Sequence, residues 1–415
     1  MKHLPPEFIQ SLESVLGRDS AVRAVEAMAG ESSVSVRLNP FKRLQGSTLP
    51  ILEGSSAVPW SPYGHILATR PVFTLHPLFH AGVYYVQDSS AMFVGWVFRR
   101  LLERFPERPL RVLDLCAAPG GKTTDLAASL REACGDDFLL VSNEVMRQRA
   151  SVLSDNVAVW GDPRVVVTSV DPKAFASLQG FFDIILADVP CSGEGMFRKD
   201  EKAVEDWSPE TVELCAARQK RILADVWPAL RDGGALLYST CTFEYAENDA
   251  NLEWAAQELG GRILPPEDAF GLRTTRHGHL LVPGEVPGEG QWVGALIKNG
   301  SDMRGIGVGA GVEALKHLKP LRAGVNEGEW KGKDFVPDLD WALSISFDRS
   351  RYPEAPVDKQ TALHYLHKDT IVLEDAPLGY NVLTYRGVPL GFVKNLGRRC
   401  NNLHPQSRRI RMDIV

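Results

Sequence analysis

The sequence predicts an α/β protein whose core is a Rossmann-like, mostly parallel sheet, preceded by a small α+β domain and followed by a β-rich part. From Leu110 onward, short apolar runs alternate with helical patterns, which indicates a parallel sheet covered by helices on both faces. In addition, Val112–Asp125 passes from an apolar run through Pro119-Gly120-Gly121 into a helical pattern. A glycine loop that leads into a helix N-terminus is typical of nucleotide-binding sites.

The N-terminal elements are predicted from periodicity and from helix-capping residues. Residues 5–30 carry two helical patterns, and an alternating strand at 33–38 is stopped by Asn39-Pro40. Residues 41–80 are rich in Pro and Gly and give no clear pattern. Tyr84-Tyr85-Val86 is typical of a strand, and Asp88-Ser89-Ser90 favours the N-cap of a helix that continues through Leu101.

In the core, five strands alternate with three helices. The predicted strands are Arg111–Leu115, Phe138–Asn143, Val165–Thr168, Phe182–Ala187 and Ala235–Ser239, and the helices are Thr123–Ala133, Arg147–Val157 and Glu210–Ala229. Ligands of such sheets bind beyond the carboxyl ends of the strands. The candidate site residues are therefore those that follow each strand, namely Cys116, Glu144, Asp171, Asp188–Cys191 and Thr240-Cys241.

The glycine loop excludes two common classes of nucleotide-binding protein. A phosphate-binding P-loop ending in Gly121-Lys122-Thr123 needs a glycine five positions before Gly121, where Cys116 stands. A dinucleotide fingerprint needs Gly-x-Gly-x-x-Gly, whereas this loop offers only the pair Gly120-Gly121. We therefore expect a smaller ligand without a triphosphate, and S-adenosylmethionine is the natural candidate.

Composition excludes other classes of protein. A chain of 415 residues suggests two or three domains, and its net charge of -6 means that any nucleic-acid-binding surface must be local. The six cysteines form no C-x-x-C pair, which argues against a disulfide framework or a zinc site. The N-terminus lacks an apolar signal core, and no apolar run is as long as a membrane span. We expect a cytoplasmic protein, a monomer, with no membrane partner and no metal.

Two acids after the strands fit a nucleoside ligand. Glu144 follows the second strand, where an acid typically accepts hydrogen bonds from ribose hydroxyls; the alternative is a surface helix cap. Asp171 follows the third strand in Ser-Val-Asp-Pro, where it could reach an adenine amino group or merely cap a turn. These two possibilities for Asp171 stay open.

Two cysteines join these acids at the same edge of the sheet. Free cysteines are usually buried, small apolar residues, but Cys191 and Cys241 follow neighbouring strands. Methylation at carbon-5 of a pyrimidine needs a thiolate, because addition at carbon-6 makes carbon-5 nucleophilic. A second thiol or base then helps to remove the carbon-5 proton and the first thiol. Asp188 would bind the ring nitrogen and the exocyclic amine, which selects cytosine.

The order of the two thiols and the family come from a resemblance. Four motifs carry it, with two shorter N-terminal pieces: Cys116–Lys122, Ser142–Glu144, Asp188–Gly195, Tyr238–Phe243, Arg37–Pro40 and Gln87–Ser90. Together they resemble the Nol/Nop/Sun family of RNA cytosine-carbon-5 methyltransferases, and within it the bacterial RsmF type, over residues 30–300. The resemblance implies activity on small-subunit (16S) ribosomal RNA.

Transferred by position, the resemblance assigns a role to each candidate residue. Cys241 would be the nucleophile and Cys191 would assist product release, with Asp188 as the third catalytic residue. One departure is Pro172, where family members commonly have glycine, which bears on the role of Asp171. The residues implied to bind S-adenosylmethionine are Cys116, Ala117, Ala118, Pro119, Gly120, Gly121, Lys122, Glu144, Asp171 and Asp188.

The C-terminal part is predicted to contact RNA. A glycine-rich stretch from Arg304 to Gly311 indicates a domain boundary. The last stretch carries six cations, Lys394, Arg398, Arg399, Arg408, Arg409 and Arg411, against one acid, Asp413. This basic segment is typical of phosphate contact, and the strands near it resemble the PUA-like domain of RsmF-type enzymes. The predicted domains are 1–75 (RNA-contacting α+β), 76–300 (core), 301–345 (β-rich linker module) and 346–415 (PUA-like).

The sequence therefore predicts an S-adenosylmethionine-dependent RNA cytosine-carbon-5 methyltransferase that acts on 16S rRNA or the small ribosomal subunit. Two alternatives remain at this point. One is an enzyme of the same fold that methylates tRNA. The other is a non-catalytic RNA-binding factor of ribosome assembly, which would bind RNA but not S-adenosylmethionine.

Overall fold

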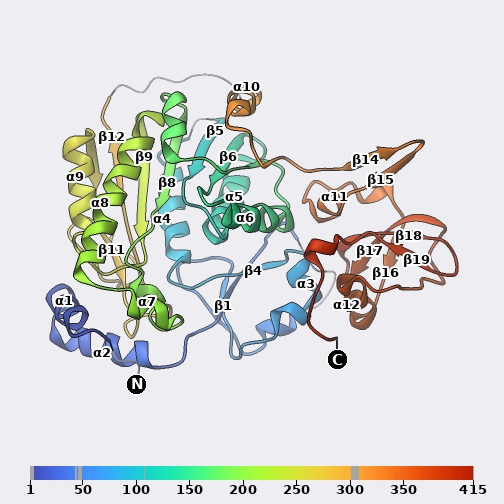
Figure 1. Ribbon diagram of the computed structural model, residues 1–415, viewed down its shortest axis with the longest axis horizontal. Helices are drawn as coiled ribbons and strands as arrows, with labels where there is room; N and C mark the ends of the chain where they lie inside the picture. Colours follow the sequence, from blue (N-terminus) through green and yellow to red (C-terminus); the bar gives the residue numbers. More distant parts are fainter. Residues whose placement is uncertain (1–3, 43, 45–48, 107, 301–307, 415) are drawn as a thin grey trace.

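The structure is a computed structural model that describes residues 4–42, 44, 49–106, 108–300 and 308–414. Figure 1 shows an elongated molecule with the methyltransferase-like core in the middle, the first two helices at one end and the C-terminal domain at the other. The boundary predicted at residue 301, and Arg304 in the predicted linker, lie outside the described residues.

The N-terminal region has the predicted helices and strands. Helices α1 (Pro6–Leu16) and α2 (Arg18–Ala29) are followed by an antiparallel sheet in the order β2-β3-β1-β4. Its strands are β1 (Ser35–Leu38), β2 (Ser56–Ala57), β3 (Gly64–Ile66) and β4 (Tyr84–Val86). Helices α3 (Pro77–His80) and α4 (Met92–Leu102) flank β4, and Asp88 accepts hydrogen bonds from the amides of Ser90 and Ala91 before α4.

The core sheet has the order β10-β12-β9-β8-β5-β6-β7-β13, with β11 added beside β12. Neighbouring strands from β9 to β7 run parallel, whereas β10, β11, β12 and β13 pair in the antiparallel sense. The bounds are β5 (Leu110–Asp114), β6 (Phe138–Asn143), β7 (Val165–Thr168), β8 (Phe182–Asp188), β9 (Leu230–Thr240), β10 (Gly261–Leu264), β11 (Gly278–Leu281), β12 (Gln291–Lys298) and β13 (Arg322–Ala323).

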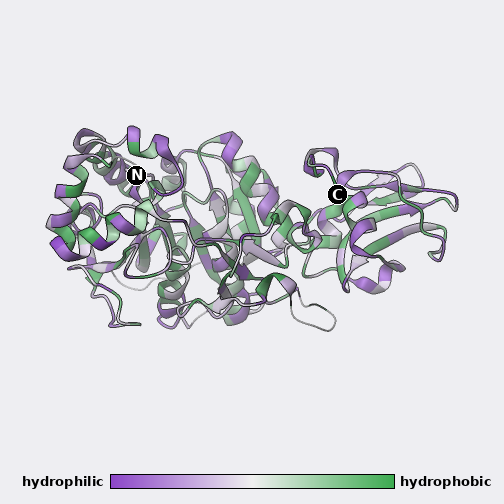
Figure 2. Ribbon diagram, turned by 90° about the horizontal axis from the view of Figure 1, so that it is seen from below, coloured by the Kyte–Doolittle hydropathy of each residue, from purple (hydrophilic) through white to green (hydrophobic). Residues whose placement is uncertain are grey.

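Alternate residues of the parallel strands face two different helical layers. Val112, Leu140 and Ile184 pack with α4, α5 (Gly121–Cys134) and α6 (Arg147–Trp160). Leu113 and Ile185, one residue further along, pack with α8 (Pro209–Val226), α9 (Asp249–Glu258) and the N-terminal helices. Figure 2 shows the apolar strands enclosed between these helices. A sheet buried on both faces requires the nearly continuous apolar runs that the sequence contains.

One prediction in the core differs in its boundary. The predicted helix to Ala229 is present as α8 followed by the short 3₁₀ helix η5 (Trp227–Ala229), but β9 begins at Leu230 rather than at Ala235, so that Gly233 and Gly234 lie inside the strand. The register of β9 on β8 shifts beside these glycines, and a Cβ at Gly234 would lie 2.9 Å from the Asp183 carbonyl oxygen. The glycines therefore allow close approach at an irregularity of the sheet rather than forming a loop before it.

The C-terminal part contains a linker region and a small sheet. The linker has α10 (Val308–Ala314), the hairpin β14 (Gly328–Lys331) and β15 (Asp334–Pro337), and α11 (Leu339–Leu343). The last sheet has the order β16-β17-β18-β19, with bounds Glu354–Pro356, Gly379–Tyr385, Val388–Asn395 and Cys400–Asn402, and is covered by α12 (Lys359–His367). Its apolar residues share one core with the N-terminal sheet, where Val36 and Tyr84 meet Leu363 and Leu390.

Candidate active site

The strand order places two loops at one crevice. From β5 the chain runs outward to β6 and β7 and then returns to β8 on the opposite side of β5. The carboxyl ends of β5 and β8 therefore flank the point where the strand order reverses, which is where sheets of this kind bind ligands. The glycine loop follows β5, and Asp188 is the last residue of β8.

The glycine loop is held from outside, so that its backbone faces the crevice. Gly120 has φ +114°, a left-handed conformation that favours glycine, and α5 begins at the next residue. Asn156 donates to the carbonyl of Pro119 (2.7 Å), and Arg149 donates to the carbonyl of Ala118 (2.9 Å). A Cβ at Gly121 would lie 3.3 Å from the Tyr85 ring, so this position has little room for a side chain.

The predicted ribose acid is buried, whereas the predicted adenine contact is exposed. Glu144 is 3% exposed, accepts a hydrogen bond from the amide of Met146 (3.0 Å) and pairs with Arg149 (3.3 Å). Asp171 is exposed, and its carboxylate accepts from the amide of Lys173 (3.0 Å), which caps the short helix η3 (Pro172–Ser177). In this structure Asp171 is therefore a helix cap.

Asp188 lies at the centre of the crevice with a cation beside it. Lys122 donates to Asp188 Oδ2 (2.8 Å), and Ser239 donates to Oδ1 (2.6 Å). Burial would lower the pKa of Lys122, but the charge of Asp188 and its hydrogen bond raise it, so this lysine stays charged. Gln291, from β12, lies 3.4 Å from Oδ1 and also donates to the Thr240 carbonyl (2.8 Å).

The two predicted thiols meet directly. Cys191 Sγ and Cys241 Sγ are 3.3 Å apart, and both side chains are partly exposed. The hydrogen bond from Cys191 lowers the pKa of Cys241, against burial and the charges of Asp188 and Glu247, which raise it, and the charge of Lys122 also lowers it. The pKa of Cys191 is raised by the same hydrogen bond and by burial. Cys241 is therefore the thiol that ionises first, as attack on a carbon requires.

Cys116 lies on the same rim, but its thiol is not poised to ionise. Burial raises the pKa of its thiol, and the charges of Asp188, Asp114 and Glu144 raise it further. The other predicted loop residues, Ala117, Ala118, Pro119, Gly120, Gly121 and Lys122, lie together between β5 and α5. A groove of about 510 Å³, lined in part by Met196, Leu214 and Arg218, reaches Cys191 from the outside.

Sequence reasoning missed several residues of the site. Asp114, the last residue of β5, accepts from the Thr123 hydroxyl (2.6 Å), while its Oδ1 is buried without a hydrogen-bond partner in the described structure. Burial raises the pKa of Asp114 to about 7. Glu194 and Glu247 are buried acids beside the thiol loops. Glu194 lies inside a motif singled out from the sequence, but no pattern indicates that either acid turns inward.

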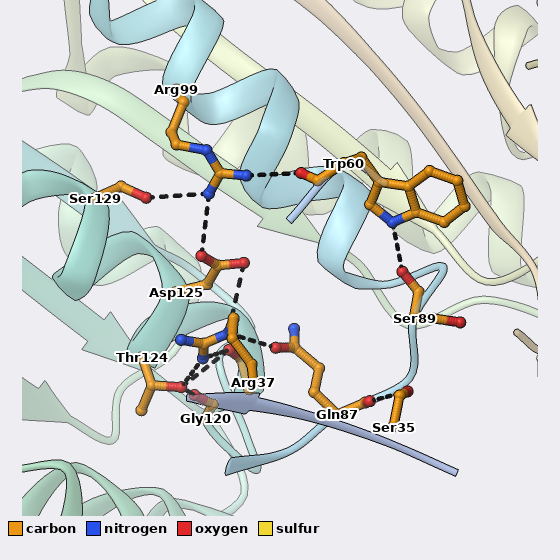
Figure 3. A network of polar contacts seen from close by, with 11 residues as sticks. Ser35, Arg37, Trp60, Gln87, Ser89, Arg99, Gly120, Thr124, Asp125 and Ser129 are labelled. Carbon is orange, nitrogen blue, oxygen red and sulfur yellow. Dashed lines mark hydrogen bonds and ion pairs between the residues drawn. The ribbon is translucent and has the colours of Figure 1, made fainter. Parts of the chain in front are cut away.

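A buried polar network joins the N-terminal sheet to the helix that follows the glycine loop (Figure 3). Arg37, on β1, donates to Gln87 (2.8 Å) and to the hydroxyl of Thr124 on α5 (2.6 Å), and its Nε lies 3.7 Å from Asp125. Arg99, on α4, lies 3.3 Å from the other oxygen of Asp125. Of the two N-terminal motifs singled out from the sequence, Arg37 and Gln87 thus lie at the start of α5, whereas Asp88, Ser89 and Ser90 contact the segment that leads into β12.

The basic segment of the C-terminus is partly neutralised. Lys394 pairs with Asp334, and Arg408 pairs with Asp155 of α6 and with Asp340. The exposed cations that remain are Arg398, Arg399, Arg409 and Arg411. Among the described residues, no cluster of three or more His, Cys, Asp or Glu side chains could hold a metal ion, and no helix is long and apolar enough to cross a membrane.

The fold and this site define a class. A sheet of this topology, with a glycine loop and two acids at its switch point, belongs to S-adenosylmethionine-dependent methyltransferases. Family models agree along the chain: residues 102–287 match "16S rRNA methyltransferase RsmB/F", residues 4–89 match the N-terminal domain of 16S rRNA methyltransferase RsmF, and residues 353–410 match the RsmF PUA domain.

Curated relatives named ribosomal RNA small subunit methyltransferase F show the family. The relative from Klebsiella pneumoniae is 30% identical over 79% of this chain and 78% of its own length. The relative from Pectobacterium atrosepticum is 31% identical over 72% of this chain, which spans only 63% of that relative. The chain belongs to the RsmF family of 16S rRNA methyltransferases.

Solved structures share the fold. A methyltransferase homologue from Pyrococcus horikoshii aligns with a TM-score of 0.56 at 24% identity, over 71% of this chain and 100% of that one. NSun6 from Pyrococcus horikoshii, solved with SFG, aligns with a TM-score of 0.58 at 17% identity, over 72% of this chain and 100% of that one.

Proposed function

We propose that this chain transfers a methyl group from S-adenosylmethionine to carbon-5 of a cytosine in 16S ribosomal RNA. The observation that carries the proposal is the pair of thiols 3.3 Å apart, with the more acidic one beside Lys122 and Asp188. Family membership supports the substrate class, and NSun6 with SFG, an analogue of S-adenosylmethionine, supports the cofactor.

The residues present fit a cationic nucleoside. The glycine loop offers backbone amides at the start of α5, and the acids Asp114, Glu144 and Asp188 follow three strands around it. Glu144 would accept hydrogen bonds from the ribose, and the free Oδ1 of Asp114 gives the positive charge a nearby acceptor. S-adenosylmethionine, when bound there, supplies an electrophilic methyl group.

The chain's own residues activate the acceptor base. The thiolate of Cys241 attacks carbon-6 of cytosine, a sulfur–carbon bond forms, and the electron pair of the 5,6 double bond makes carbon-5 nucleophilic. Asp188 accepts a hydrogen bond from the exocyclic amine and orients the ring. Lys122 fixes the orientation of Asp188, because its ammonium group donates to that carboxylate.

Release of the product needs a proton acceptor and a leaving thiolate. After methylation, the carbon-5 proton passes to a base, the 5,6 double bond re-forms, and Cys241 leaves as a thiolate. Cys191 is the group next to that sulfur, and its hydrogen bond stabilises the leaving thiolate. This assigns Cys241 as nucleophile and Cys191 as the residue that assists elimination.

The target base must leave its stack to reach a partly buried thiol, so a loop or an unfolded segment of rRNA suits the site better than intact duplex. The exposed arginines of the C-terminal domain, Arg398 and Arg399 among them, are available for phosphate contacts. Action as a monomer in the cytoplasm stays a prediction from the sequence.

The proposal is tested with purified protein, labelled S-adenosylmethionine and three RNA substrates: naked 16S rRNA, the small ribosomal subunit and bulk tRNA. We expect label in 5-methylcytosine of 16S rRNA in the first or second sample. Label confined to tRNA would support the tRNA alternative. Binding of RNA without any binding of S-adenosylmethionine by calorimetry would support a non-catalytic factor and overturn the proposal.

A further inference from the structure

The two thiol-bearing loops are joined by carboxylates that cross in opposite directions. Glu194, three residues after Cys191, accepts a hydrogen bond from the amide of Phe243, two residues after Cys241 (2.6 Å). Glu247, six residues after Cys241, accepts from the amide of Ser192, the residue after Cys191 (3.1 Å). Each loop thus provides the acid that binds the backbone of the other loop.

Further contacts fix the same alignment. The amide of Gly195 donates to the carbonyl of Cys241 itself (2.7 Å). A Cβ at Gly195 would lie 3.0 Å from that carbonyl oxygen and 3.1 Å from the Cβ of Cys241, so a side chain there would push the two loops apart by a few tenths of an ångström. The hydroxyl of Ser192 donates to Glu247 and lies 3.0 Å from the hydroxyl of Thr242, from which it can accept. The backbone beside each sulfur is therefore tied to the opposite loop.

The side chains of both acids also accept hydrogen bonds from residues outside the two loops. Glu194 is 1% exposed, and its second oxygen accepts from the indole of Trp207 (2.8 Å). Trp207 in turn packs against Phe8 of α1. Glu247 is fully buried and accepts from the amide group of Gln219 (2.7 Å), which also donates to the Pro190 carbonyl (3.0 Å). These donors are neutral.

A buried carboxylate held by neutral donors costs free energy, because it leaves water without gaining a cation. Burial accordingly raises the pKa of Glu194 and that of Glu247. A neutral core would be more stable, so stability alone does not account for the two acids. What both acids achieve in the structure is the alignment of the two loops, whose sulfurs meet at 3.3 Å.

We propose that Glu194 and Glu247 are positioning residues that hold the Cys191 thiol within hydrogen-bond distance of the Cys241 sulfur. Neither acid touches the substrate; both act through the backbone of the opposite loop. The inference rests on the proposed function for its catalytic consequence, but its direct consequence, the acidity of Cys241, is measured without RNA or S-adenosylmethionine.

The two acids differ in what a glutamine replacement can do. Both oxygens of Glu194 face donors, the amide of Phe243 and the indole of Trp207, so Glu194→Gln sets an NH₂ group against an N–H. At Glu247, the oxygen that faces the Ser192 hydroxyl can be replaced by NH₂, because a hydroxyl can also accept. Glu247→Gln therefore preserves the contacts that Glu247→Ala removes.

The experiment measures alkylation of Cys241 by iodoacetamide as a function of pH, in the full-length protein, with each cysteine followed by peptide mass spectrometry. We expect Cys191→Ala and Glu194→Gln each to slow the reaction of Cys241 about tenfold at pH 7, with the pH midpoint raised by about one unit. Glu247→Ala should act in the same direction but less strongly, because it also removes a negative charge that raises the pKa of Cys241. Glu247→Gln should keep most of the wild-type rate.

The matched control is Glu244→Gln. Glu244 lies on the same loop as Glu247, but both its oxygens accept from Ser11 of α1 rather than from the Cys191 loop. We expect no change in the midpoint of Cys241. A thermal melt of every variant identifies any that fails to fold. If Glu194→Gln does not fold, the comparison of Glu247→Ala with Glu247→Gln still decides the test.

An unchanged Cys241 midpoint in folded Glu247→Ala and Glu194→Gln would overturn the inference. An equal loss of Cys241 reactivity in Glu247→Gln and Glu247→Ala would also overturn it, since position 247 would then need a charge rather than the hydrogen-bond contacts. The two failures are distinguishable. If the pH midpoint of Cys241 rises in these variants but the wild-type protein methylates no RNA, the positioning role is supported and the proposed function is rejected.

Discussion

The half of the crevice beside the glycine loop and the half that carries the thiols are fixed by different physical means. On the loop side, acids are paired with cations: Arg37 and Arg99 with Asp125, Arg149 with Glu144, and Lys122 with Asp188. On the thiol side, Glu194 and Glu247 accept hydrogen bonds from amides, an indole and a hydroxyl. Without a cation beside them, Glu194 and Glu247 have pKa values that burial raises.

This difference matters for the chemistry that each half performs. The loop side has to bind a ligand in one place, and a rigid, charged scaffold serves that purpose. The thiol side has to set the distance between two sulfurs within a few tenths of an ångström, which short hydrogen bonds from backbone amides do more directly than long cationic side chains.

Each half of the crevice carries a cysteine, and the largest effect on methyl transfer is expected from replacing the one on the thiol side. Cys241→Ser should lower methyl transfer by at least about 10³-fold, because a hydroxyl at neutral pH is not an adequate nucleophile for carbon-6. Cys116→Ser is the control from the loop side and should keep nearly full activity, since its buried thiol has a raised pKa. Initial rates with saturating RNA check both. Full activity of Cys241→Ser would reject the mechanism.

Asp114 is the exception on the loop side, because no cation pairs with it in the described structure. Its pKa is raised from 3.8 to about 7, so the folded state holds a proton that the unfolded state loses. Its contribution to stability therefore falls as pH rises from about 4 to 7, by up to about 4 kcal/mol. Asp114→Asn should remove that fall while the Thr123 hydrogen bond is kept.

The measurement for Asp114 is the difference in free energy of unfolding between Asp114→Asn and wild type, by denaturant titration at several pH values. The difference should grow in favour of the variant as pH rises. A constant difference from pH 4.5 to 7.5 would mean that Asp114 is ionised throughout. Asp114 would then no longer be an exception among the acids of the loop side.

Asp188 lies where the two halves meet, and its loss should affect catalysis more than binding of the methyl donor. Asp188→Asn removes the partner of Lys122 and the acceptor for the exocyclic amine, which should lower kcat by about 10²-fold. Asp171→Asn, an exposed helix cap, is the matched control and should change kcat less than about twofold. A comparable loss in both variants would support the predicted contact of Asp171 with the cofactor.

The smallest effect tests how closely the loop-side scaffold is packed. A Cβ at Gly95 of α4 would lie 2.2 Å from an Asp125 oxygen, so Gly95→Ala has to displace the carboxylate that Arg37 and Arg99 share. We expect a loss of about 1–3 kcal/mol in the free energy of unfolding. Gly30→Ala, where the nearest atom is 3.4 Å away, should be neutral. Equal stability of the two variants would show that α4 and α5 can move apart.

Much of the fold could be predicted because local patterns and tertiary contacts agree. Strand β6 and strand β7 have the predicted ends, and α5 and α6 begin within two residues of prediction. The position of each residue after its strand was sufficient to predict that Cys191 lies near Cys241 and Asp188 near the glycine loop, because parallel strands end at one edge of the sheet. The prediction failed at Gly233 and Gly234, where a sheet irregularity overrides the usual link between glycine pairs and loops.

The sequence by itself determined the sheet, the loop and the residues that follow each strand, since these follow from periodicity and from position along the chain. Only the tertiary structure decided what surrounds them. It set the 3.3 Å between the sulfurs, turned Glu194 and Glu247 inward, paired Lys122 with Asp188, and neutralised Lys394 and Arg408 with distant acids. These features join residues far apart in the chain, and no local pattern encodes such contacts.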